Sequence, residues 1–381
     1  MELAAIFAEH WEAHASTHRH CLAAPHYRAA RAVMACRTPE MGGRVYQCGD
    51  CGRQRYAYHS CNHRSCTKCG ALAQKQWAAA QELKLLPVPY FMLTFTVPEE
   101  LRAPAYAEQA WFYDAMFQAV SATLMDFAQD ERHLGGTPGF TAVLHTWTRQ
   151  MQHHPHLHVI MPGVALGADG LRLSRAKADR YLFPVKALGA AFRNRLRRLI
   201  EARDAQGGAP LMPCIPPQVW RAAWVVDAQA VGDGKRALRY LARYASKSAL
   251  SAGRLLGYTK DGRIRLHCQR SGSGRWEVIL LTPSEFLRRW SLHVLPKGLV
   301  RLRHYGFHSA PAKDKLQRVR EILQTPAPAK PAPLAPPKPK CPCCGRDMLP
   351  HREIPRPPFA LRILMQTAAR PAPVPVAPDS G

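Results

Sequence analysis

Closely spaced cysteine pairs constrain the fold of this chain more than any other feature of its sequence. Seven of its twelve cysteines lie between Cys21 and Cys69, among them Cys48-Gly-Asp-Cys51 and Cys66-Thr-Lys-Cys69, with fourteen residues between the two pairs. Each pair forms a tight turn whose thiolates converge on one ion, and two pairs complete a tetrahedral zinc site. The spacing therefore predicts a small, ribbon-like zinc-binding unit over residues 1–85, whose folding is coupled to metal binding.

Other cysteines leave the ligand set of this unit open. Cys36, Cys61 and His63 lie close enough in sequence to join the site or to hold a second ion. Far along the chain, Cys341-Pro-Cys-Cys344 resembles half of a zinc ribbon, and only His351 is near it as a further ligand. Basic residues surround the first two pairs, so this unit is a candidate for DNA recognition as well as a fold stabilised by zinc.

The charge of the chain is strongly positive. Lysine and arginine number 53 against 27 acidic residues, which gives a formal net charge of +26 and a pI of about 10.0. A globular protein with this excess is expected to bind a polyanion, and nucleic acid is the first candidate. An acidic membrane is the alternative, but the longest apolar stretch, residues 85–98, is too short to span a bilayer. Since no secretory signal pattern is visible, we expect a soluble, cytoplasmic protein that does not bind a membrane.

The segment over residues 86–310 has the pattern of an α+β domain. Three runs rich in β-branched and aromatic residues are expected to form strands, at residues 91–97, 141–147 and 157–161. The last two are expected to pair antiparallel. Helical periodicity is visible over about residues 105–130 and 185–203. Strands and helices interleaved in this way predict an antiparallel sheet with flanking helices.

Beyond about residue 310 the composition changes. Proline and alanine dominate residues 326–339, which is typical of a stiff linker that has no core of its own. We therefore expect a Pro/Ala-rich linker over residues 311–340. A partial CxxC element and a disordered tail are expected over residues 341–381.

Candidate metal ligands stand out in His156-Leu157-His158. In a strand, alternate side chains share a face, so both imidazoles project together while Leu157 enters the core. Two imidazoles on one face can hold a divalent ion and leave its other positions to water and phosphate oxygens. The segment is rich in histidine, so the pair could also arise by chance. The third ligand stays open among four candidates: Gln150, Gln152, His145 and His154.

Two candidate nucleophiles follow in Tyr240-Leu-Ala-Arg-Tyr244. On a helix, Leu238 and Leu241 fall on a buried stripe, whereas Tyr240, Tyr244 and Lys247 fall together on the opposite one. Neighbouring cations favour the phenolate, the form that attacks phosphorus. The alternative is a solvated basic helix whose tyrosines are merely exposed. The nearby arginines are Arg236, Arg239 and Arg243.

These motifs resemble a known family. Phe91-Met-Leu-Thr-Phe-Thr96, His156-Leu157-His158 and Tyr244-Ala-Ser-Lys247 occur in the order of the three motifs of HUH endonucleases, which initiate rolling-circle replication and transposition. The closer resemblance is to the two-tyrosine transposases of the insertion sequence ninety-one family, and it covers about residues 5–310. The blocks that carry it are Cys36-Arg-Thr with Gly42-Gly43, the cysteine pairs, Leu86-Pro-Val-Pro-Tyr-Phe91, His154-Pro-His-Leu-His158, Tyr240-Leu-Ala-Arg-Tyr244, and Leu292-His-Val-Leu-Pro-Lys-Gly298 with Arg303-His-Tyr-Gly306.

The resemblance implies a metal-dependent DNA nickase and strand transferase of a bacterial mobile element, associated with the nucleoid. Structural Zn²⁺ would hold the first unit, and Mg²⁺ or Mn²⁺ would bind His156 and His158. One tyrosine, with Tyr244 beside Lys247 the expected initiator, would form a 5′-phosphotyrosine link and free a 3′-hydroxyl for the host replication machinery. Single-stranded or hairpin element ends would be recognised by basic residues, of which the candidates are Arg236, Arg239, Arg243, Lys297, Arg301 and Arg303.

Two other functions are compatible with parts of the sequence. A plasmid or phage rolling-circle replication initiator would share the histidine and tyrosine motifs, but the zinc unit and the block at residues 292–298 argue against it. A zinc-dependent DNA-binding protein without catalysis would explain the charge and the cysteines. It would leave the histidine and tyrosine motifs as coincidences.

Overall fold

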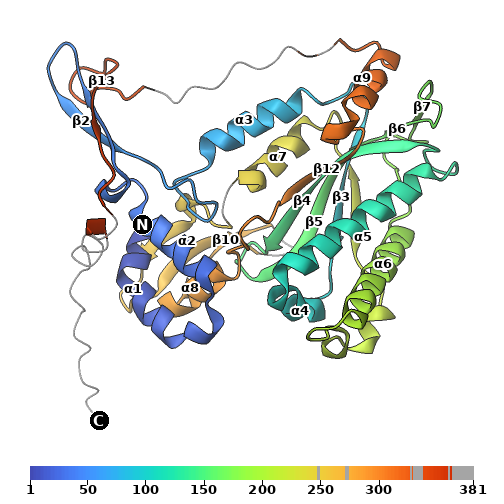
Figure 1. Ribbon diagram of the computed structural model, residues 1–381, viewed down its shortest axis with the longest axis horizontal. Coiled ribbons are helices and arrows are strands. Elements are labelled where there is room, and N and C mark those ends of the chain that lie inside the picture. Colours follow the sequence, from blue (N-terminus) through green and yellow to red (C-terminus); the bar gives the residue numbers. More distant parts are fainter. Residues whose placement is uncertain (247–248, 271–273, 327, 329–337, 359–360, 363–381) are drawn as a thin grey trace. The chain divides into compact units, whose positions relative to one another are not determined.

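The computed structural model describes residues 1–246, 249–270, 274–326, 328, 338–358 and 361–362 (Figure 1). Lys247 therefore lies outside the described residues, and so do the side chains of Arg243 and Tyr244. The chain forms two compact units. The first comprises residues 1–72, 250–294 and 334–381, and the second comprises residues 73–249 and 295–333. Each unit thus contains segments that are far apart in the sequence.

Three helices form the apolar centre of the first unit. They are α1 (Leu3–Thr17), α2 (Ala24–Ala35) and α8 (Pro283–Ser291). Phe7 of α1 stacks on Trp11 at 5.3 Å between ring centroids and meets the edge of Trp290 of α8 at 4.6 Å. Aromatic pairs in these geometries bury large apolar areas. This packing joins the start of the chain to a helix that lies far along the sequence.

Two three-stranded antiparallel sheets complete the first unit. One contains β1 (Gly43–Gln47), β2 (Gln54–Tyr58) and β13 (Leu349–Ile354) in the order β13-β1-β2. The other contains β9 (Leu255–Tyr258), β10 (Ile264–Gln269) and β11 (Trp276–Leu281) in the order β11-β10-β9. Residues 349–354, expected within a disordered tail, thus form a strand, because β1 supplies the backbone partners that a lone strand lacks.

The second unit is built on a seven-stranded antiparallel sheet. Its strand order is β7-β6-β4-β5-β3-β8, and β12 also pairs with β4. The expected antiparallel pairing of the second and third predicted strands is confirmed by β4 and β5. The strands are β3 (Tyr90–Thr96), β4 (Thr137–Trp147), β5 (His153–Pro162), β6 (Val164–Leu166), β7 (Leu173–Arg175), β8 (Val226–Ala230) and β12 (Leu302–Gly306).

Helices cover both faces of this sheet. On one face, Phe91, Leu93 and Phe95 of β3 enter the main core together with α5 (Gln109–Gln129) and α6 (Val185–Ala205). On the other face, Tyr90 of β3 packs with α7 (Lys235–Ser246) in a second core. The alternation of strand side chains thus divides the two cores. The remaining helices of this unit are α4 (Arg102–Ala107), α9 (Lys313–Ile322) and most of α3 (Ala71–Glu82).

Short 3₁₀ turns link many of these elements. They are η1 (Arg19–Cys21), η2 (Pro39–Met41), η3 (Glu99–Leu101), η4 (Met212–Cys214), η5 (Pro217–Trp220), η6 (Ala252–Arg254) and η7 (Ala310–Ala312). The combination of an N-terminal cysteine-rich region, an antiparallel sheet and flanking helices confirms the α+β class expected from the sequence. Helix α9 lies within residues 311–340, where a linker was expected, because Val319 is buried in the second core. Among the described residues, none of the helices has both the length and the apolar character needed to cross a membrane.

A glycine fixes the close approach of β4 and the chain after β12. A Cβ atom added at Gly139 would lie 2.2 Å from the ring of Phe307, which is fully buried. We expect Gly139→Ala to reduce the free energy of unfolding by about 1–3 kcal/mol, the usual cost of overpacking a core. Chemical denaturation measures the change. Gly253→Ala is the control, because nothing lies within 4 Å of its added Cβ, and equal stability of the two variants would contradict this packing.

Candidate functional site

Three histidines converge on the α7 face of the large sheet. The β4–β5 register sets His145 opposite His156, and the β3–β5 register sets Thr94 opposite His158. The ligand nitrogens of His145, His156 and His158 all lie within 4.8 Å of one another. We call these residues the histidine triad. The two histidines singled out from the sequence therefore share a face, and His145 of the four open candidates joins them.

Hydrogen bonds orient two rings of the triad. The Nδ1 of His156 lies 2.8 Å from the backbone oxygen of His154. A carbonyl oxygen can only accept, so this Nδ1 carries the proton and leaves Nε2 with a lone pair. The Nδ1 of His158 lies 2.9 Å from the hydroxyl oxygen of Thr94, which holds that ring in a similar way. Thr94 was not among the residues predicted from the sequence, although its position on the polar face of a predicted strand could have indicated it.

The triad is neutral at neutral pH. Burial, together with repulsion from a charged His158, lowers the pKa of His156 to about 3. Burial also lowers the pKa of His158 to about 4 and holds the pKa of His145 well below its usual range. Because a metal binds the unprotonated imidazole, the buried His145 and His158 and the half-buried His156 fit a divalent ion as neutral rings. First-row transition ions accept imidazole readily, whereas Mg²⁺ prefers oxygen ligands.

Helix α7 brings Tyr240 to the triad. Its start is fixed by Asp233, whose carboxylate accepts a hydrogen bond of 3.0 Å from the backbone N–H of Lys235. Leu238 and Leu241 are buried in the core between α7 and the sheet, as the helical pattern predicts. The half-buried Tyr240 presents its ring 6.0 Å from that of His158, at 86°. Tyr244 lies on the same helix, four residues further along.

A cation lies next to the triad. The guanidinium of Arg102 is 3.1 Å from Nδ1 of His154, whose ring centroid is 5.4 Å from that of His156. Arg102 also forms an ion pair of 2.8 Å with the exposed Glu99. No sequence signal pointed to Arg102, because its nearness to His154 depends on how α4 packs against β5. Arg102 thus brings a cationic group next to His154, the neighbour of the triad.

The candidate DNA-binding residues differ in how accessible they are. Arg303 forms an ion pair of 2.6 Å with Asp114 and lies over the ring of Phe117, and Arg239 forms one of 2.8 Å with Glu82. Arg301 is only 8% exposed. Arg236 and Lys297 are exposed, and Arg239 is exposed as well despite its ion pair.

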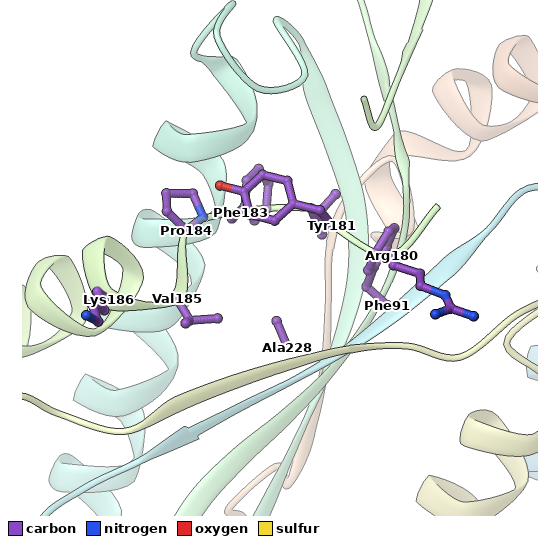
Figure 2. Close-up of a pocket in the computed structure, with 9 residues that line it drawn as sticks. Phe91, Arg180, Tyr181, Phe183, Pro184, Val185, Lys186 and Ala228 are labelled. Carbon is purple, nitrogen blue, oxygen red and sulfur yellow. The ribbon is translucent and has the colours of Figure 1, made fainter. Parts of the chain in front are cut away.

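A pocket of about 350 Å³ lies on the other face of the sheet (Figure 2). Phe91 and Ala228 point to that face, whereas Thr94 and the triad point to the opposite one. The pocket is therefore separated from the triad by the sheet. Its lining residues are Phe91, Arg180, Tyr181, Leu182, Phe183, Pro184, Val185, Lys186 and Ala228.

Eight described cysteines of the first unit form two groups of four. One group is Cys36, Cys61, Cys66 and Cys69, and the other is Cys48, Cys51, Cys341 and Cys344. Hydrogen-bond contacts between Sγ atoms measure 3.5 to 3.7 Å. Zn–S bonds of about 2.3 Å in a tetrahedron place sulfurs about 3.8 Å apart, so both groups fit a structural zinc ion.

This grouping differs from the single site of Cys48, Cys51, Cys66 and Cys69 expected from sequence spacing. The reason is that β13 pairs with β1, which brings Cys341 and Cys344 beside the turn of the β1–β2 hairpin. The pair Cys66 and Cys69 instead folds back to Cys36 and Cys61. His351, the ligand considered for the second pair, belongs to neither group.

The two pairs of the second group share one backbone pattern. The N–H of Cys48 donates to the backbone oxygen of Arg53, and the N–H of Gly52 donates to that of Cys48. In the same way, the N–H of Cys341 donates to the backbone oxygen of Arg346, and the N–H of Gly345 donates to that of Cys341. Gly52 and Gly345 both adopt positive φ, at 69° and 71°. Both turns read Cys-x-x-Cys-Gly-Arg. This repeated motif was the sequence signal that could have paired them.

Comparison with known proteins gives the family. Residues 6–97 match the family described as "Transposase zinc-binding domain", and residues 139–315 match the family described as "Putative transposase". The chain is 36% identical over 343 residues to "Putative transposase y4qJ" of Sinorhizobium fredii, covering 86% of this chain and 85% of the relative. It is 27% identical over 295 residues to "Transposase for insertion sequence element IS801" of Pseudomonas savastanoi pv. phaseolicola, covering 72% and 68%.

These matches identify the chain as a member of the IS91 family of transposases, with an N-terminal zinc-binding domain. Among solved structures, the conjugative relaxase TrwC in complex with OriT DNA matches 42% of this chain and 67% of its own. The TM-score is 0.24 and the sequence identity 14%. A similarity at that level supports no conclusion about this chain.

The second cysteine group predicts a specific loss of metal. We expect the double change Cys341→Ser and Cys344→Ser to lower the zinc content by one equivalent, because two of four thiolates are removed. Plasma mass spectrometry of the purified full chain measures the content. Cys343→Ser is the control, because this exposed thiol belongs to neither group of the described residues. Unchanged zinc in the double variant would contradict the grouping.

Proposed function

We propose that this transposase cuts and rejoins single-stranded DNA at the ends of an insertion sequence through a 5′-phosphotyrosine intermediate, by a metal-dependent rolling-circle route. Membership of the family supports transposition. The single observation that carries the chemistry is the Tyr240 ring, which lies 6.0 Å from the ring of His158 in the triad. This contact supports a role for Tyr240 as a nucleophile beside a metal held by the triad.

In this proposal His145, His156 and His158 hold Mn²⁺ or Mg²⁺. The bound ion would act as a Lewis acid that polarises the scissile phosphate. Burial keeps the three rings neutral, and hydrogen bonds with Thr94 and with the backbone oxygen of His154 orient His158 and His156, respectively. With three nitrogen ligands, Mn²⁺ suits the site better than Mg²⁺.

Tyrosine performs the covalent step. The phenol of Tyr240 gives up its proton to solvent as its oxygen bonds to phosphorus. The bond from phosphorus to the 3′ oxygen breaks, and this oxygen takes up a proton from solvent and leaves as the 3′-hydroxyl. The 5′ end then stays on the enzyme as a phosphodiester of tyrosine. A second 3′-hydroxyl can attack this link and release the phenol, so joining needs no nucleotide cofactor.

The second nucleophile in this proposal is Tyr244. Successive cuts at two element ends call for two attacking groups, and residues four apart lie about one turn apart on a helix. The sequence favoured Tyr244 as initiator, but its side chain lies outside the described residues. We propose Tyr240 for this role because its ring lies against that of His158. The freed 3′-hydroxyl would serve the host replication machinery.

DNA is held electrostatically in this proposal. The formal charge of +26 attracts the phosphate backbone, and the exposed Arg236 and Lys297 offer direct phosphate contacts. A replication initiator is disfavoured by the match to "Transposase zinc-binding domain" over residues 6–97. A DNA-binding protein without catalysis differs in one measurable respect, the covalent adduct.

The adduct provides the direct test. With Mn²⁺ and labelled single-stranded DNA carrying the element ends, we expect a denaturation-resistant complex that is lost in the double variant Tyr240→Phe, Tyr244→Phe, because no phenol oxygen remains to attack. Gel electrophoresis under denaturing conditions measures it. Tyr181→Phe is the control, since this exposed tyrosine lies in the loop before α6. Tight binding without any adduct in the wild type would contradict the proposal.

The orienting hydroxyl gives a quantitative test of the metal site. We expect Thr94→Val to weaken Mn²⁺ binding by about 10- to 100-fold, the usual loss when a partner of a ligating histidine is removed. Electron paramagnetic resonance titration of the protein without DNA measures the affinity. Thr96→Val is the matched control on the same strand face. Equal affinities in the two variants would show that Thr94 does not orient a ligand.

A further inference from the structure

The β9–β10–β11 sheet of the first unit leaves one face exposed. Trp276, Val278 and Leu280 alternate along β11 and are 55%, 43% and 48% exposed. The register sets them opposite Gln269, His267 and Arg265 of β10, so these six residues share one face. We call this surface the β11 face. It is accessible although half of its residues are apolar or aromatic.

The opposite face of the same sheet is buried. Ile264 and Leu266 are fully covered, and Cys268 is 1% exposed. The first unit covers that side with its helices: Tyr258 of β9 bonds to His10 of α1 at 3.1 Å, and α8 contacts β11. The sheet therefore has a core side and an accessible side. Apolar residues gathered on an accessible side mark an interaction surface.

The chemistry of the β11 face is aromatic and basic. The ring of His267 lies 4.5 Å from that of Trp276, tilted by 36°, so the two form a broad platform. Arg265 lies on the face, and Arg270 and Arg275 border it, all three exposed. None of the six residues that make up this face is acidic, and the nearest carboxylate in β11, Glu277, belongs to the buried side. A negatively charged partner with flat, stackable groups matches this surface.

We propose that the β11 face binds single-stranded DNA, with bases stacked on Trp276 and His267 and phosphates at Arg265, Arg270 and Arg275. Aromatic side chains bind unpaired bases in this way without reading their sequence. The proposal deepens the proposed function, since it supplies a place to hold the strand that the triad would cut. The residues involved are separate from the triad.

The geometry suits a single strand better than a duplex. From Trp276 to Leu280 the strand extends about 13 Å at about 3.3 Å per residue, and sheet platforms of this kind stack two or three bases. In a duplex, neighbouring base pairs cover the base faces, so a flat sheet cannot reach them. Val278 and Leu280 add apolar contact for a base that leaves the aromatic platform.

Affinity for unstructured single-stranded DNA tests the platform. In the full chain we expect Trp276→Ala to weaken binding on the order of tenfold by fluorescence anisotropy, as for the loss of one stacked base. Trp276→Phe should retain most of the affinity, because it keeps an aromatic face. Leu171→Ala is the control, since Leu171 is 65% exposed and lies in the second unit. Equal affinities of Trp276→Ala and the wild type would overturn the proposal.

Photocrosslinking of the wild type provides a second measurement that depends on no variant. With an oligonucleotide containing 5-iodouracil, we expect mass spectrometry to find crosslinks in residues 264–269 and 276–281. Crosslinks that avoid both strands would overturn the proposal. Self-association through the β11 face would also overturn the proposal. In that case light scattering would give a lower mass for Trp276→Ala than for the wild type, and the DNA affinity would be unchanged.

The adduct assay separates this proposal from the proposed function. Leu171→Ala should form the tyrosine adduct as the wild type does, whereas Trp276→Ala should need more DNA to reach the same adduct yield, because it weakens the hold on the strand. Weaker binding of Trp276→Ala in a protein that forms no adduct would support the β11 face and contradict the cleavage chemistry. Normal adduct formation by the wild type, together with equal DNA affinities of Trp276→Ala and the wild type, would support the cleavage chemistry and contradict the β11 face.

Discussion

The register between β4 and β5 is the constraint on which the candidate site depends. A shift of one residue would turn every side chain of β5 to the other face of the sheet and separate His156 and His158 from His145. What prevents this shift is the core on the opposite face, where Leu144, Leu157 and Val159 are fully buried. The packing of α5 and α6 therefore fixes the position of polar groups that these helices do not touch. Burial of apolar side chains on one face of the sheet therefore fixes the positions of the triad histidines on the other face.

Local sequence patterns predicted the structural features that depend on residues close together in the chain. The shared face of His156 and His158 follows from strand alternation, and the helical stretches follow from apolar spacing. The third candidate ligand could not be chosen from Gln150, Gln152, His145 and His154, because His145 joins the other two histidines through strand pairing. The same limit explains the cysteines. Cys48 meets Cys344 across 296 positions of sequence, and the spacing of the N-terminal cysteines contains no information about that contact.

The net charge of the protein follows from its sequence, but the sequence did not predict which basic side chains are exposed. The excess of basic residues correctly indicated a DNA-processing family, because long-range attraction depends on the sum. Which arginines face solvent depends instead on the fold. Arg303 is half-buried and paired with Asp114, whereas Arg236 is exposed, and so is Arg239 despite its ion pair with Glu82. The aromatic residues of β11 were not singled out by the sequence, since alternating Trp276, Val278 and Leu280 equally describe a buried strand.

The pairing of β13 with β1 has a consequence for how the protein is made. Strand β1 and its cysteine turn leave the ribosome early, but their partners at residues 341–354 are synthesised only after the whole second unit. Until then Cys48 and Cys51 have only half of their ligand group. Completion of this metal group thus requires that the sheet domain has already been made. A product terminated before residue 341 would therefore carry the sheet domain without a closed ribbon.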